Sequence, residues 1–178
     1  MLACVGARFY NGKQVKNNIA KKIWEMLVRS RARMYNKAVI MPRHSIREVI
    51  LFMNKIISTD KGPGAIGPYS QAVQTAGGML FVSGQIPLVP ATGAMVEGGI
   101  KEQATQVLNN LKGIVEAAGY QLSDVVKTTV YLADIKDFGT VNEIYGQYFT
   151  ENCPARVCVE VSKLPKDALV EIDVIASK

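Results

Sequence analysis

Arg156 is the only arginine after residue 53, and the same part of the chain contains no histidine. Histidine is the usual proton carrier near neutral pH and the commonest metal ligand, so serine-type triads, His-paired thiols and His-zinc sites are excluded from residues 54–178. Carboxylate chemistry remains. A guanidinium is planar and always charged, and it can bind a small carboxylate or phosphate through two parallel hydrogen bonds. Arg156 is therefore the first candidate for a binding residue.

The cysteines favour packing roles and a reducing compartment. Cys4, Cys153 and Cys158 are odd in number and lack CxxC spacing, which argues against a disulfide framework or a zinc site. Cys158 lies in a strand-like run and has no histidine base beside it, so a small packing residue is favoured over a reactive thiol. We expect neither a metal nor a cofactor.

Charge divides the chain into a basic leader and an acidic domain. Residues 1–53 hold 11 of the 21 Lys and Arg residues and only two of the 15 acids, which gives +9 for the leader and −3 for residues 54–178. The basic character therefore belongs to the leader, and the domain itself gives no reason to expect nucleic acid as a partner. The apolar patches of the leader are too short to span a bilayer, which takes about 20 residues.

The Arg-rich, acid-poor leader is typical of an organellar presequence, which would place the protein in mitochondria. A second interpretation makes Met53 the natural start and residues 1–52 an upstream extension, which is compatible with the cytoplasm. A basic arm that binds RNA or anionic lipid is a third. We therefore divide the chain into residues 1–53, outside the fold, and a domain of residues 54–178.

Periodicity predicts the elements that must position Arg156. Two helices have an apolar stripe at helical spacing, residues 100–118 with Gly119 as a left-handed cap and residues 138–149 with Asp137 as N-cap. The strands alternate or sit beside turn residues, and they cover residues 71–75, 79–83, 126–132, 157–162 and 169–176. The order β-β-α-β-α-β-β predicts an α+β sandwich in which two helices pack on one face of a mixed sheet.

A glycine motif before the first hairpin does not indicate a nucleotide fold. Residues 62–67 satisfy GxGxxG, but Pro63 and Pro68 bracket the motif and prevent the helix that a dinucleotide site requires. We expect these glycines to form a tight loop around Tyr69.

Strand alternation also assigns the faces of the sheet. In the last strand Glu171 and Asp173 oppose the aliphatic residues Val170, Ile172 and Val174. If every aliphatic face lies under the helices, the other face gathers polar side chains from three strands: Lys127, Thr129, Tyr131, Arg156, Cys158, Glu160, Glu171 and Asp173. A face that mixes charged and apolar groups is typical of an oligomer interface with an embedded site.

Five short motifs in the domain resemble one known family. They are Gly67-Pro68-Tyr69-Ser70-Gln71-Ala72, Phe81-Val82-Ser83-Gly84-Gln85-Ile86-Pro87, Val141-Asn142-Glu143-Ile144-Tyr145, Pro154-Ala155-Arg156 and Val170-Glu171-Ile172. In order and in spacing they are similar to the signature of the RidA (YjgF/UK114-type) reactive-intermediate deaminases. The resemblance runs from about Ile56 to the C-terminus and does not cover the leader.

The resemblance implies a chorismate-mutase-like fold and a homotrimer whose three sheets line a central barrel, with clefts at the subunit interfaces. The implied activity is the hydrolysis of 2-imino acids or their enamine tautomers, such as 2-iminobutanoate and 2-iminopropanoate, to 2-oxo acids and ammonia. Neither a metal nor a cofactor is implied, because an imine carbon is already electrophilic.

The resemblance also implies roles for seven residues. Arg156 would bind the substrate carboxylate, and Glu171 would orient or deprotonate the attacking water. The remaining residues would form the pocket, with Tyr69 as a wall, Ser83, Gly84 and Asn142 as shaping or hydrogen-bonding groups, and Cys158 in contact with the imine nitrogen through its main chain. Burial would raise the pKa of Glu171 and a nearby Arg156 would lower it, and the sequence leaves the balance open.

Other interpretations stay open at this point. Arg156 could form only a buried intersubunit salt bridge with Glu171 or Glu160. Glu160 and Asp173 are taken as structural. Rival functions are an endoribonuclease or translation inhibitor, against which stand the net charge of −3 and the missing histidine, and a trimer that binds small acids without turnover.

Overall fold

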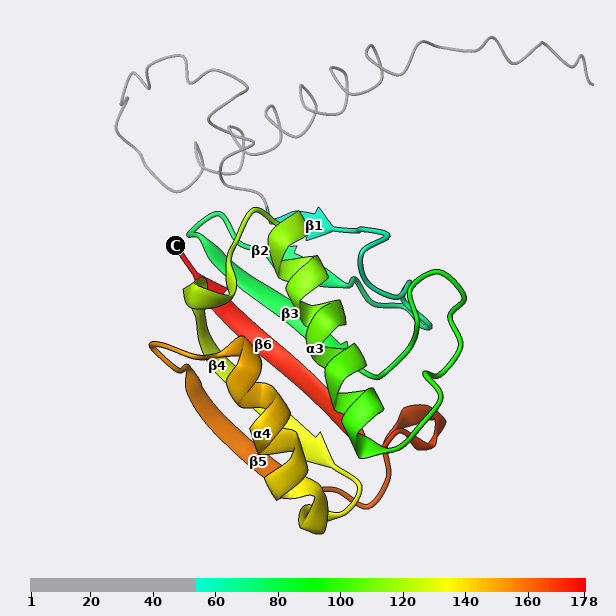
Figure 1. Ribbon diagram of the computed structural model, residues 1–178. Helices are drawn as coiled ribbons and strands as arrows, with labels where there is room; N and C mark the ends of the chain where they lie inside the picture. Colours follow the sequence, from blue (N-terminus) through cyan, green and yellow to red (C-terminus); the bar gives the residue numbers. More distant parts are fainter. Residues whose placement is uncertain (1–53) are drawn as a thin grey trace, which may run out of the picture. The chain divides into compact units, whose positions relative to one another are not determined.

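The computed structural model of the protein describes residues 54–178, and the predicted leader lies outside the described residues. Six strands form one sheet in the order β1-β2-β3-β6-β4-β5 (Figure 1). The pair β4 and β5 is parallel, and the other neighbours are antiparallel. The strand bounds are β1 Lys55–Ile57, β2 Ala72–Gln74, β3 Met79–Gln85, β4 Val125–Leu132, β5 Ala155–Glu160 and β6 Val170–Ser177.

Both helices, α3 (Ile100–Ala117) and α4 (Phe138–Tyr148), cover the same face of the sheet (Figure 1). The main core lies between these two layers, where α3 contributes Val107, Leu111 and Ile114 and β6 contributes Val170 and Ile172, all fully or almost fully buried. Short 3-10 turns, η1 (Leu122–Asp124), η2 (Ile135–Asp137) and η3 (Pro165–Asp167), lie in the connections. Among the described residues, none of the helices combines the length and apolar character needed to cross a membrane.

The predicted α+β sandwich is confirmed. The cap at Gly119 is also as predicted, since its φ of +85° is a left-handed conformation that glycine adopts without strain. The prediction omitted β1, which has three residues and therefore shows too little alternation to be recognised. Asp137 is the N-cap residue of α4, as predicted, but its side chain accepts no capping hydrogen bond, because η2 continues directly into α4. The side chain of Asp134 caps η2 by accepting from the Lys136 N–H.

The face assignment of β5 was also wrong. The parallel register pairs Arg156 with Thr128 and Cys158 with Val130, and paired residues lie on the same face. Thr128 and Val130 are buried, and the Thr128 hydroxyl is 2.9 Å from the Tyr145 hydroxyl of α4, so Arg156 lies on the helix-covered face. β5 is an edge strand, and its register with β4, not its aliphatic pattern, decides which side chains meet the helices.

The opposite face, here called the free sheet face, has no helix over it in the described part of the chain (Figure 1). Its polar members come from β4 and β6, as predicted, but its β5 members are apolar: Val157 and Val159 are 42% and 40% exposed. The free sheet face consists of Phe81, Lys127, Thr129, Tyr131, Val157, Val159, Glu171, Asp173 and Ile175.

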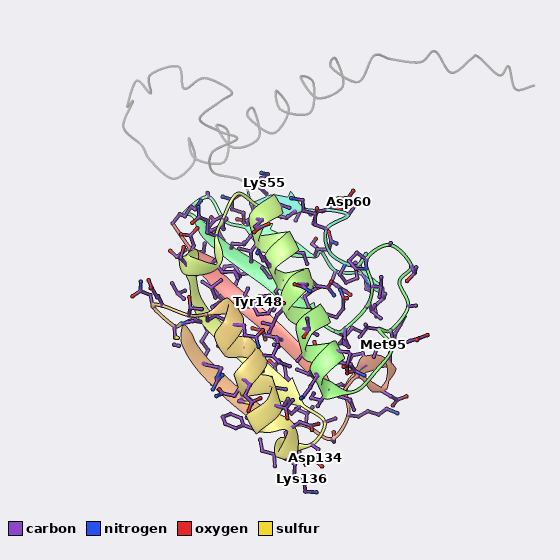
Figure 2. All side chains as sticks on the ribbon, in the orientation of Figure 1. Lys55, Asp60, Met95, Asp134, Lys136 and Tyr148 are labelled. Atoms are coloured by element: carbon purple, nitrogen blue, oxygen red, sulfur yellow. The ribbon has the colours of Figure 1, made fainter. Side chains whose placement is uncertain are left out.

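The GxGxxG segment is a loop, as predicted, and Gln71 ties it to the domain. The buried Gln71 side chain donates to the carbonyls of Gly62 and Pro63 at 3.1 and 2.8 Å and accepts from the Thr59 N–H at 2.7 Å. Between the two helices, the Tyr148 hydroxyl is 2.8 Å from Asn109 Oδ1 and so connects α4 to α3 (Figure 2). These contacts fix the chain before β2 and the end of α4.

Candidate functional site

Arg156 lies between β5 and one side of α4. Its guanidinium donates to Asn142 Oδ1 at 2.9 Å. The guanidinium carbon is 4.8 Å from the ring centroid of Tyr145 and 5.6 Å from that of Phe138, distances at which an aromatic face attracts a cation. Three side chains of one helix therefore hold the arginine in place without neutralising it.

Arg156 has no carboxylate partner among residues 54–178, where no ion pair includes it. Glu160, one suggested partner, instead accepts a hydrogen bond from the Ile135 N–H at 2.9 Å. Asn142 presents a neutral oxygen, and the two rings add no formal charge. The charge of the guanidinium is therefore available to an anionic ligand.

Cys158, two residues along β5, packs against the main core. Burial raises the pKa of its thiol, and the smaller effect of Arg156 acts in the opposite direction. A raised pKa favours the neutral thiol, which supports a packing role for the side chain over a nucleophilic one. Asn142, Arg156 and Cys158 are here called the arginine cluster.

Glu171 lies on the free sheet face, beside the backbone of Gly84. A methyl group built on Gly84 would overlap the Glu171 carboxylate, so the absence of a side chain there gives the carboxylate its position. The pairing of β3 with β6 is irregular between Val82 and Gln85, at the point where Gly84 lies. Burial, and to a lesser extent the charge of Asp173, raises the pKa of Glu171.

Ser83 precedes Gly84 in β3, and Tyr69 lies in the segment just before β2. The Ser83 hydroxyl donates to the Ser70 carbonyl at 2.7 Å, which couples β3 to the segment that carries Tyr69. Tyr69 is 46% exposed, and its hydroxyl accepts from the Ile66 N–H at 3.2 Å. Tyr69, Ser83, Gly84 and Glu171 are here called the glutamate cluster.

Arg156 and Glu171 lie on opposite faces of the sheet. Ile172 is fully buried beneath the helices, so Glu171 beside it points to the free sheet face. Arg156 contacts α4 and points to the other face. The expectation that Arg156 and Glu171 share a face of one subunit was therefore wrong, because it rested on the mistaken orientation of β5. The arrangement also explains why Arg156 is not among the groups that shift the pKa of Glu171.

Sequence reasoning missed the two aromatic rings beside Arg156, although a signal was present. Phe138, Asn142 and Tyr145 are spaced i, i+4 and i+7 along the predicted helix, so they form a stripe on one face. The stripe contacts Arg156 only because β5 directs the arginine side chain toward this helix. The sequence alone did not show that orientation. Within the described residues, no group of three or more His, Cys, Asp and Glu side chains could hold a metal ion.

Gly84→Ala should displace the Glu171 carboxylate. If Glu171 orients or deprotonates the attacking water, as the resemblance implies, kcat/KM for imine hydrolysis should fall by about 100-fold, because misplacing a catalytic group by about 1 Å can have this effect. Gly64→Ala is the matched control, since a methyl group there meets nothing within 4 Å. An unchanged kcat/KM in a Gly84→Ala protein with a wild-type melting temperature would argue against a role for this carboxylate.

Comparisons with known proteins identify the family. A family model described as endoribonuclease L-PSP matches residues 59–178. A RutC family protein of Pyrococcus horikoshii is 58% identical over 126 residues, which cover 71% of this chain and 99% of the relative. The human 2-iminobutanoate/2-iminopropanoate deaminase is 52% identical over 124 residues, which cover 70% of this chain and 90% of the human protein.

Solved structures of the same family match the fold of this chain. E. coli TdcF with bound serine matches with a TM-score of 0.67 and 47% identity, and the match covers 70% of this chain and 98% of TdcF. The chain therefore belongs to the RidA/YjgF/RutC family, as its five motifs predict. Close relatives in this family are named as 2-iminobutanoate/2-iminopropanoate deaminases.

Proposed function

We propose that this protein is a deaminase that hydrolyses 2-imino acids, such as 2-iminobutanoate and 2-iminopropanoate, to 2-oxo acids and ammonia. The observation that carries the proposal is the environment of the Arg156 guanidinium. A guanidinium held by Asn142 and two rings, without a carboxylate partner in residues 54–178, suits the carboxylate of a small acid. The names of the close relatives and the serine bound to TdcF support the same substrate class.

The site requires two subunits, because Arg156 and Glu171 lie on opposite faces of one sheet. We place the arginine cluster of one subunit against the glutamate cluster of its neighbour in a homotrimer. Phe81, Val157 and Val159 support this arrangement, since each is 40% or more exposed on the free sheet face. Burying these apolar side chains between subunits would stabilise the assembly.

In the proposed reaction Arg156 holds the substrate carboxylate and leaves the C=N carbon open to attack by water. Glu171 accepts a proton from the water as the oxygen bonds to that carbon, and passes this proton to the imine nitrogen, which gives a neutral amino alcohol. Glu171 then takes the hydroxyl proton and passes it to the departing nitrogen. The C–N bond breaks, ammonia leaves, the hydroxyl oxygen becomes the carbonyl of the 2-oxo acid, and the carboxylate is restored.

The raised pKa of Glu171 fits this role. A carboxyl group that exchanges protons with water and an amine works best when its pKa lies closer to neutral pH than that of a free glutamate. Tyr69, Ser83 and Asn142 would bound the pocket, and the main chain at Cys158 would contact the imine nitrogen.

The test uses 2-iminobutanoate released by a pyridoxal-phosphate-dependent dehydratase acting on threonine in the presence of semicarbazide. We expect catalytic amounts of the full chain to lower the initial rate of semicarbazone formation, since the imine is hydrolysed before it is trapped. If suppression needs stoichiometric protein, the trimer binds small acids without turnover. If the imine is unaffected and the purified protein cleaves RNA, the endoribonuclease alternative replaces the deaminase.

A further inference from the structure

Tyr131 and Asp173 form a pair on the free sheet face that the proposed reaction does not use. The Tyr131 hydroxyl donates to Asp173 Oδ2 at 3.0 Å. Asp173 follows Glu171 by two residues on β6, so both carboxylates point to the same side. Tyr131 is the cross-strand partner of Glu171 in the pairing of β4 with β6. The three side chains therefore occupy neighbouring positions on one face.

The ring of Tyr131 is held by a second, smaller core. This core consists of Ile86, Leu88, Leu164 and Ala168, which are all buried, and Tyr131 packs against it. Packing against these residues, which lie outside the strands, holds the ring in place. Its hydroxyl is directed at Asp173. A hydroxyl fixed in this way limits the rotation of the Asp173 carboxylate beside Glu171.

We infer that Asp173, oriented by Tyr131, is a positioning residue that sets how tightly Glu171 holds its proton. Two carboxylates on one half-buried face repel each other when both are ionised, so a charge fixed on Asp173 disfavours a second charge on Glu171. The hydroxyl of Tyr131 stabilises the charge on Asp173 and partly offsets it. The direction of the pKa shift of Glu171, raised with Asp173 as a contributing cause, agrees with this geometry.

Few other charged or titratable groups face Glu171. β4 contributes Lys127 and Tyr131, and β6 contributes Asp173. The free-face residues of β3 and β5, which include Phe81, Val157 and Val159, carry no charge. Lys127 forms no ion pair with either carboxylate in the described part of the chain. In the subunit itself, Asp173 is therefore the acidic neighbour that acts on Glu171.

The inference deepens the proposed function, because the catalytic role of Glu171 rests on it, but the proton affinity of Glu171 can be measured without any activity. The full chain is labelled with ¹³C at the glutamate side-chain carboxyl carbons and titrated by NMR. The Glu171 resonance is assigned by its loss in Glu171→Gln.

We expect Asp173→Asn to move the Glu171 titration midpoint to lower pH, because the repulsion is removed and the side-chain shape is kept. Asp60→Asn is the matched control: it makes the same change on an exposed residue of the loop after β1 (Figure 2). A midpoint in Asp173→Asn that equals that of Asp60→Asn overturns the inference.

Tyr131→Phe keeps the ring in the second core and removes only the hydroxyl. We expect the midpoint to move to higher pH, since the charge on Asp173 is then less compensated. In the Asp173→Asn background the same change should have no further effect, because Tyr131 acts through that charge. Equal effects in both backgrounds would overturn the role of the pair.

If the deaminase proposal holds, the acidic limb of the kcat/KM profile shifts to lower pH in Asp173→Asn, together with the NMR midpoint. A shifted midpoint without any imine hydrolysis, even in the wild-type chain, would contradict the proposed function and leave the effect of Asp173 on Glu171 established.

Discussion

Arg156→Lys is expected to lower kcat/KM for 2-iminobutanoate by at least about 100-fold, and Arg156→Ala by about 1,000-fold. Each hydrogen bond to a charged group contributes about 1.5 to 3 kcal/mol, and a guanidinium can make two parallel bonds to one carboxylate. Lysine keeps the charge but not the planar pair of donors, so it restores only part of the binding. The measurement is the initial rate of semicarbazone formation over a range of protein concentrations.

The structure predicts that these variants fold. Arg156 is partly exposed, and in the described residues its contacts are one hydrogen bond to Asn142 and the faces of two rings. We expect the melting temperature and the sedimentation coefficient to stay close to wild type. Lys163→Ala is a control for the loss of a cation, since Lys163 is 74% exposed and pairs with Asp167 on the surface. Full activity in a folded Arg156→Ala protein would eliminate the proposed anchor.

Mixing two inactive variants is expected to restore activity. In an Arg156→Ala chain the glutamate cluster is intact, and in a Glu171→Gln chain the arginine cluster is intact. If one site takes its arginine from one subunit and its glutamate from the next, random assembly of equal amounts of the two chains leaves about a quarter of all sites in wild-type form. Refolding the variants together should therefore give about a quarter of wild-type activity.

This gain distinguishes a shared site from a site within one subunit. The proposed site needs two subunits, because Arg156 and Glu171 point to opposite faces of one sheet. A site within a single subunit would carry a defect in every chain, so mixing the variants would not restore its activity. Distinct affinity tags on the two chains show whether mixed assemblies have formed, and the same variants refolded separately and then combined serve as the control. Tagged mixed assemblies without activity would contradict the shared site.

Much of the fold was predictable because local patterns and tertiary contacts agree. The stripe of α3 and the glycine at position 119 predict a helix and its end, and both are present. The alternation in β6 predicts which side chains are buried, and Val170, Ile172 and Val174 are almost completely buried. Periodicity works for these elements because they lie in the centre of the domain, where one face must be apolar.

The orientation of β5 was not predictable from its own residues. Its sequence alternates valine with polar side chains, and that pattern suits either a valine face toward the helices or a valine face toward a partner. The parallel register with β4 decides between them, and this register depends on residues distant in the chain. The same uncertainty hid the support of Arg156 by Phe138 and Tyr145.

The sequence by itself determined the chemistry that the domain can carry. The five motifs specify the family, and one arginine without any histidine in residues 54–178 favours carboxylate chemistry, since these properties depend on which residues are present and in what order. Only the tertiary structure decided where that chemistry lies. It places Arg156 and Glu171 on opposite faces of one sheet, because strand pairing fixes the direction of every side chain along a strand.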